Sequence, residues 1–177
     1  MNKKILVALG DSITYGWPYE QEFSWVNTLQ QNLSNLCILN KGVSGDTFGD
    51  MLNRLEEDVL IYKPDYCIVM GGANEAYQHI PQPVLKENFL KIIKELKQIE
   101  CKIIIGLPTP VDYEPLEKYL QEIREWLKDC SRQHQISILD FYTLMLNKDT
   151  NKIDSSLFID GCHPNKKGYQ LMGQYAV

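Results

Sequence analysis

The chain has 177 residues, of which 44% are hydrophobic and 23% charged, and its 18 Lys and Arg against 23 Asp and Glu give a formal net charge of -5. This composition is typical of a globular protein of about one domain, and it excludes a disordered, collagen-like or coiled-coil chain. The acidic balance also disfavours a nucleic-acid partner, because phosphate binding needs a basic face.

Five short runs of aliphatic residues recur along the chain and predict buried β-strands. Each run is almost continuously hydrophobic, as a strand covered on both faces requires. The predicted strands span residues 5–9, 36–39, 66–70, 103–107 and 136–139. The first run follows two lysines, like the start of a signal peptide, but it is shorter than the ~7–15 apolar residues that a signal peptide needs. We interpret it as the first strand.

The segments between the strands show the helical spacing of apolar residues. The clearest are 85–99 and 116–130, shorter ones lie at 25–33 and 48–59, and a last helix holds Leu171, Met172 and Tyr175. Strands that alternate with helices predict an α/β protein in which helices cover both faces of a parallel sheet. No repeat or linker interrupts the pattern, so we expect a single domain over residues 1–177.

Residues of catalytic type follow four of the five predicted strands. They are Gly10-Asp11-Ser12, the segments 40–47 and 71–75, and the tail from Asp140 onward. In an open α/β sheet the ligand crevice lies beyond the carboxyl ends of the strands. The sequence therefore predicts a site at this edge of the sheet.

Of the three histidines, only His163 has a carboxylate placed to support a catalytic role. His79 and His134 are most simply surface residues, whereas Asp160 precedes His163 by three positions. One turn of chain can bring the Asp160 carboxylate to Nδ1, which leaves Nε2 free to accept a proton. Taken alone, this pair is better explained as a surface turn.

Ser12 is the candidate nucleophile, because it directly follows the first strand; the alternative role is a helix N-cap. Cys162 ranks below it, since Cys162 ends no strand and adjoins the candidate base. Gly45 can offer a backbone N–H, and Asn74 a side-chain N–H, to an oxyanion. The alternatives are a left-handed turn at Gly45 and an Asn turn or cap at Asn74.

Together these residues resemble the SGNH hydrolases, also called GDSL esterases/lipases. The similar blocks are Gly10-Asp11-Ser12, Gly42-x-x-Gly45, Gly72-Ala73-Asn74-Glu75 and Asp160-x-x-His163. They occur in the family's order, and Glu75 stands where the family usually has Asp.

The resemblance implies a three-layer α/β/α sandwich, flavodoxin-like, with a parallel five-stranded sheet of order 2-1-3-4-5. It also implies a triad of Ser12, His163 and Asp160. The oxyanion hole would consist of the backbone amides of Ser12 and Gly45 and the side chain of Asn74. The long segment before His163 would reach back across the fourth strand to deliver it.

The implied function is a serine ester hydrolase of the esterase, lipase, lysophospholipase or thioesterase type, which needs no metal or organic cofactor. An acyltransferase with the same triad is one alternative. A non-catalytic flavodoxin-like binding module is another, although the turn after the first strand matches no phosphate-binding pattern.

The partner that we expect is a small-molecule acyl ester. Tyr15, Trp17 and Pro108 are placed to wall an apolar acyl pocket, although core packing explains them equally well. An acyl ester, a thioester, a lysophospholipid and an acetylated sugar are all compatible with the same triad, and the oligomeric state stays open.

No stretch approaches the ~20 apolar residues of a membrane span. The five cysteines form no C-x-x-C pair, which is typical of reduced thiols. With the interpretation of the first run as a strand, these features predict a cytoplasmic protein.

Overall fold

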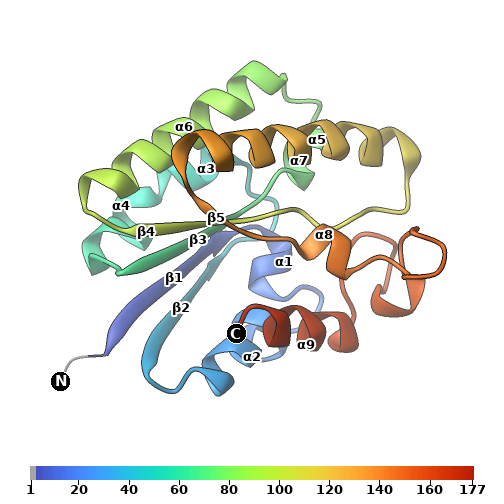
Figure 1. Ribbon diagram of the computed structural model, residues 1–177, viewed down its shortest axis with the longest axis horizontal. Coiled ribbons are helices and arrows are strands. Elements are labelled where there is room, and N and C mark those ends of the chain that lie inside the picture. Colours follow the sequence, from blue (N-terminus) through green and yellow to red (C-terminus); the bar gives the residue numbers. More distant parts are fainter. Residues whose placement is uncertain (1–2) are drawn as a thin grey trace.

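The computed structural model describes residues 3–177. Its centre is a parallel sheet of five strands in the order β2-β1-β3-β4-β5, which confirms the predicted fold and strand order (Figure 1). The strands are β1 (Lys4–Gly10), β2 (Leu36–Gly42), β3 (Tyr66–Met70), β4 (Lys102–Gly106) and β5 (Ser137–Leu139). β2 runs past its predicted end because the polar residues Asn40 and Lys41 continue to pair with β1.

Helices cover both faces of the sheet and complete three layers (Figure 1). One layer holds α3 (Phe48–Asn53), α4 (Leu55–Asp58), α5 (Ala73–Tyr77), α6 (Gln82–Gln98) and α7 (Glu114–His134). The other holds α1 (Ser12–Tyr15), α2 (Trp25–Asn32), α8 (Phe141–Leu144) and α9 (Lys166–Tyr175). Single 3-10 turns are η1 (Gln21–Phe23), η2 (Leu60–Tyr62) and η3 (Ser155–Leu157). Within residues 3–177, none of the helices combines the length and hydrophobicity needed to cross a bilayer.

The strands are hydrophobic along their length because successive side chains enter two different cores. On β1, Val7 and Leu9 pack in the core beneath α3, α6 and α7. Leu6 and Ala8 pack on the opposite face, in the core beneath α2 and α9. The continuous hydrophobic pattern therefore reports burial on both faces, as the sequence predicts.

The single helix predicted over residues 48–59 is wrong, because the chain forms two short helices that meet at Arg54. Its backbone (φ -102°, ψ 8°) leaves the helical conformation between α3 and α4. The guanidinium pairs with Asp46 and Asp58, and it donates hydrogen bonds to the carbonyl oxygens of Gly10 and Lys41. These contacts tie the helix break to the ends of β1 and β2, and apolar spacing does not reveal them.

The parallel register brings the ends of three strands to one edge of the sheet. Gly10, the last residue of β1, lies between Gly42 of β2 and Met70 of β3. The loops that follow these strands therefore begin side by side. They carry the nucleophile and oxyanion candidates.

Gly42 ends β2 at the point where this strand touches α1. A Cβ on Gly42 would lie 2.1 Å from the backbone N of Tyr15 and 2.6 Å from the backbone C of Thr14. Backbone atoms cannot rotate away, so a side chain at this position would push α1 off the end of the sheet.

We expect Gly42→Ala to lower the free energy of unfolding by at least about 1–3 kcal/mol, because it overpacks a rigid contact. Urea denaturation measures this change. Gly49→Ala in α3 is the matched control, because its Cβ would meet only side-chain atoms of Asn88 and Thr47 at 3.1 Å or more, and Ala favours a helix. Equal losses in the two variants would show that the packing at Gly42 is not the cause.

Candidate active site

Ser12 lies at the turn from β1 into α1, and its side chain is free for chemistry. The N-cap of α1 is Asp11, whose Oδ1 accepts a hydrogen bond from the Ile13 N–H at 3.0 Å. The alternative role of Ser12 as the N-cap is therefore wrong. Ser12 Oγ instead lies 3.0 Å from His163 Nε2, across 151 residues of sequence.

His163 is held by Asp160 in the orientation that this contact needs. Its Nδ1 lies 2.8 Å from Asp160 Oδ2, and Asp160 Oδ1 accepts the backbone N–H groups of His163 and Cys162 at 2.7 and 2.9 Å. Burial disfavours the ionised carboxyl, but these hydrogen bonds outweigh burial and hold the pKa of Asp160 below its usual value. The three side chains thus form one continuous hydrogen-bonded chain.

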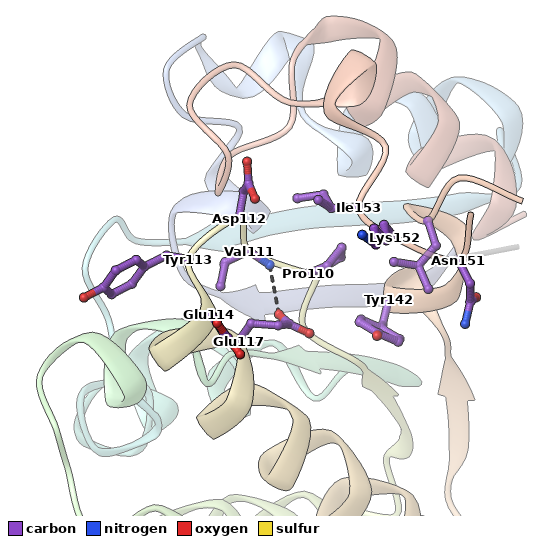
Figure 2. A pocket seen from close by; sticks show the side chains of 11 residues that line it. Pro110, Val111, Asp112, Tyr113, Glu114, Glu117, Tyr142, Asn151, Lys152 and Ile153 are labelled. Atoms are coloured by element: carbon purple, nitrogen blue, oxygen red, sulfur yellow. Dashed lines mark hydrogen bonds between the residues drawn. The ribbon is translucent and has the colours of Figure 1, made fainter. Parts of the chain in front are cut away.

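A loop between β4 and α7 docks the segment that carries His163. The backbone N–H of Asp112 donates to the carbonyl of Gly161 at 2.7 Å. The loop is itself fixed by Glu117, which accepts the Val111 N–H at 3.0 Å (Figure 2). Glu117 also pairs with the buried Arg124. The position of the histidine therefore depends on an ion pair in α7.

The oxyanion candidates Gly45 and Asn74 lie on adjoining segments of the chain. The Asn74 Nδ2 donates to the carbonyl of Asp46 at 2.8 Å, so the amide side chain adjoins the loop that carries Gly45. Gly45 has a φ of 90°, and a Cβ there would meet no atom within 4 Å, so its backbone borders open space. The N–H of Ser12, as the first residue of α1, has no acceptor inside the helix. The left-handed turn at Gly45 therefore does not exclude the expected role of its backbone N–H as an oxyanion donor.

A cavity of about 390 Å³ opens on Ser12 and His163. The nine residues that line it are Ser12, Ile13, Ala73, Asn74, Tyr77, Tyr113, Leu116, Cys162 and His163. Six of them are neither triad nor oxyanion candidates, and sequence reasoning did not assign them to a substrate pocket. The sequence could have indicated Tyr77 as a lining residue, since it follows Asn74 by one helical turn. Whether Tyr113 and Leu116 line the pocket depends on the residue at which α7 begins, and the sequence pattern does not define that residue.

The three residues expected to wall a substrate pocket lie outside this lining. Tyr15 donates its hydroxyl to Glu20. Pro108 is buried behind Gly72 and near Arg124. Trp17 comes closest, because its ring packs against the His163 ring with centroids 4.3 Å apart. The pocket that the structure forms is built from α5 and α7 instead.

The other two histidines and Cys162, the cysteine next to the site, are not placed to act as base or nucleophile. His79 is exposed, and His134 contacts Lys97 on the far side of α7. Burial, together with the nearby charges of Asp160 and Asp11, raises the pKa of Cys162 to about 12, so this residue is a thiol at neutral pH. In the part of the chain that the structure describes, no three His, Cys, Asp or Glu side chains are grouped to hold a metal ion.

Two further carboxyl groups are buried beneath the site. Asp11 is 2% exposed, and burial raises its pKa to about 6 against the opposing Ile13 N–H and the charge of His163. Glu75 is 1% exposed, and burial raises its pKa to about 7, although its Oε1 accepts the Phe48 N–H at 2.5 Å. Within residues 3–177 its other oxygen has no hydrogen-bond partner. Adjacent residues, Asn74 and Glu75, thus hold the loop before α3 at two points.

Known proteins are similar to this chain over almost its whole length. A family model described as the GDSL-like lipase/acylhydrolase family matches residues 8–171. The chain is 24% identical over 182 residues to an arylesterase from Vibrio mimicus, covering 99% of this chain and 87% of that protein. It is 23% identical over 150 residues to an acetylxylan esterase from Geobacillus stearothermophilus, covering 77% of this chain and 68% of that protein. The solved structure of a G-D-S-L family protein from Desulfitobacterium hafniense DCB-2 superposes with a TM-score of 0.91 at 31% identity, covering 98% of both chains.

We expect Glu75→Gln to flatten the pH dependence of stability. A pKa of about 7 in the folded protein, against an ordinary value of 4.5, means that stability falls as pH rises through this window. Gln is neutral and keeps an oxygen for the Phe48 N–H, so up to about 3 kcal/mol of this loss should disappear. Thermal unfolding followed from pH 4 to 8 measures the effect.

Glu87→Gln is the control, because this glutamate pairs with Lys91 and its side chain is 65% exposed. The control should leave the slope of stability against pH between pH 5 and 8 as it is in the unmodified protein, because this side chain is solvent-exposed. If Glu75→Gln shows the same slope as the unmodified protein, burial does not govern the titration of Glu75. In Glu75→Gln, stability should still fall with rising pH, but with a smaller slope, because the pKa of Asp11 is also raised.

Proposed function

The chain belongs to the GDSL-like lipase/acylhydrolase family and is a carboxylic ester hydrolase, and from this we propose that it works through an acyl-enzyme on Ser12. The observation that carries the proposal is the hydrogen-bonded chain from Ser12 Oγ to His163 Nε2 and from His163 Nδ1 to Asp160. A nucleophile, a base and a group that orients the base lie in contact there, as acyl transfer requires.

In the first step, Ser12 Oγ attacks the carbonyl carbon of the ester while His163 Nε2 takes the hydroxyl proton. The contact at 3.0 Å is short enough for this transfer. Asp160 holds Nδ1 and stabilises the imidazolium that forms, and its lowered pKa keeps it ionised at neutral pH. His163 then returns the proton to the leaving alcohol as the C–O bond breaks.

The tetrahedral intermediate carries a negative charge on the former carbonyl oxygen. The donors that we propose for it are the N–H groups of Ser12 and Gly45 and the second N–H of Asn74 Nδ2, whose first binds the carbonyl of Asp46. Such donors are preorganised, and loss of one typically costs ~10²–10³ in kcat. In the second step water attacks the acyl carbon while His163 takes a proton from the water. The bond between the acyl carbon and Ser12 Oγ then breaks, His163 returns the proton to Ser12 Oγ, and the carboxylic acid leaves.

We expect Ser12→Ala to lower the turnover of p-nitrophenyl acetate by at least ~10⁴-fold, because the nucleophile is removed. Circular dichroism should be unchanged, since Asp11 and not Ser12 caps α1. A serine-reactive fluorophosphonate should label the unmodified protein and fail to label the variant. Ser155→Ala, which changes an exposed serine of η3, is the control and should retain both turnover and labelling. Turnover above about 1% in Ser12→Ala would exclude the acyl-enzyme.

Asp160→Asn tests the orienting role separately from the nucleophile. Asn retains an oxygen for the N–H groups of Cys162 and His163, so the turn should persist, but it cannot stabilise the imidazolium. We expect kcat to fall by ~10²–10⁴ while KM changes little. Steady-state kinetics measure kcat and KM separately. An unchanged kcat would show that Asp160 does not contribute to catalysis.

A further inference from the structure

The cavity that opens on Ser12 has an apolar wall. Besides the triad and oxyanion candidates, its lining consists of Ile13, Ala73, Leu116 and Cys162, with the rings of Tyr77 and Tyr113 at the rim. No Lys, Arg, Asp or Glu occurs among the nine residues that line it within residues 3–177. The Cys162 thiol is neutral, as its pKa of about 12 shows. The space beside the nucleophile therefore offers few partners to a charged or hydroxyl-rich group.

A second cavity, of about 490 Å³, differs from the first because charged side chains form part of its lining (Figure 2). Asp112, Glu114, Glu117 and Lys152 contribute charged side chains to it. It lies beyond the loop between β4 and α7, and Tyr113 borders both cavities. Figure 2 shows the Tyr113 side chain directed away from Tyr142 and Lys152, two other residues that line the second cavity. The loop thus separates charged groups from the space around Ser12.

This separation limits what can bind next to the scissile bond. A sugar hydroxyl or a charged group that packs against this apolar wall exchanges hydrogen bonds to water for fewer hydrogen bonds to the protein, which costs free energy. A hydrocarbon group gains free energy in proportion to the apolar area that it buries. The acyl group stays attached to Ser12 through both steps, so a cavity that opens on Ser12 stabilises it throughout the reaction.

We propose that the substrate is an ester with an apolar, medium-length acyl chain, and that this chain lies in the cavity between Tyr77, Tyr113 and Leu116. The proposal rests on the proposed function, since it needs an acyl group on Ser12. At roughly 30 Å³ for each water-sized group, a volume of about 390 Å³ accommodates roughly 13 such groups when it is filled completely, which is more than an acetyl group needs. Part of the space is open to solvent, so we expect a chain of six to eight carbons to occupy the rest. Acetylated sugars are therefore poorer substrates than hexanoyl or octanoyl esters.

The test is a series of p-nitrophenyl esters from acetate to dodecanoate. We expect kcat/KM to rise about fourfold for each methylene up to six to eight carbons and then to level or fall. Acetyl and hexanoyl esters of one monosaccharide should show the same acyl preference. A series of alkyl acetates, from ethyl to octyl, varies the alcohol alone and should show no comparable rise.

Variants of the cavity wall should change the preference itself. Leu116→Ala removes part of the wall, and Ala73→Leu fills the space, and each should lower the ratio of hexanoate to acetate kcat/KM about tenfold. Lys152→Ala, in the charged second cavity, is the matched control and should leave the ratio unchanged. Rates are normalised to fluorophosphonate-titrated active sites, so misfolded protein does not enter the ratio.

Three outcomes would overturn the proposal: acetate as the best acyl group, a chain-length dependence that follows the alcohol, or equal ratios in the wall variants and in Lys152→Ala. Each of them leaves the proposed function intact as long as Ser12→Ala is inactive on the esters that the protein does cleave. Activity retained in Ser12→Ala would instead contradict the acyl-enzyme and leave the chain-length series to be explained by another nucleophile.

Discussion

The end of β1 is the constraint on which the rest of the site depends. Gly10 pairs with both neighbouring strands, and its carbonyl accepts hydrogen bonds from the Val43 N–H and from Arg54. A Cβ on Gly10 would lie 2.2 Å from Thr14 Oγ1, so only glycine lets α1 begin this close to the sheet. The next residues are then Asp11, which caps α1, and Ser12, whose position follows from the same contact. The sheet, the helix and the proposed nucleophile are therefore fixed together.

The same short-range constraints explain why much of the fold and site could be predicted from the sequence. Strands buried on both faces leave continuous aliphatic runs, and the residues that follow them must lie at one sheet edge. Asp160 and His163 are close in sequence, so one turn suffices to join them, and the structure bonds them to Ser12. Gly42 and Gly45 are positions where backbone packing or a φ of 90° requires glycine. Each of these sequence features reflects a contact between residues close in the chain, or follows from the order of the strands in the sheet.

The features that escaped prediction depend on contacts between distant segments. The helix break at Arg54 arises because its side chain binds the ends of β1 and β2, and the periodicity of residues 48–59 contains no trace of that. Tyr15 and Pro108 follow the correct strands, but their side chains turn toward Glu20 and the interior. The cavity is lined from α5 and α7 because the loop after β4 docks on Gly161. Proximity to a motif in sequence does not determine which side chains share its pocket.

Carboxyl groups around the site differ in protonation for reasons of burial, and this difference suits the proposed chemistry. Asp160 accepts three hydrogen bonds at the edge of the site and has a lowered pKa, so it is charged where an imidazolium forms. Asp11 and Glu75 are buried and adjoin in sequence the proposed oxyanion donors Ser12 and Asn74, and their pKa values are about 6 and 7. A negative charge there would oppose the charge that develops on the substrate oxygen. Burial raises the protonated fraction of Glu75 near neutral pH, while its carbonyl oxygen still accepts the Phe48 N–H and holds the Gly45 loop. One chain thus keeps a carboxylate ionised beside the proposed base and weakens the charge of another next to the proposed oxyanion donors, a division set mainly by burial and hydrogen bonding.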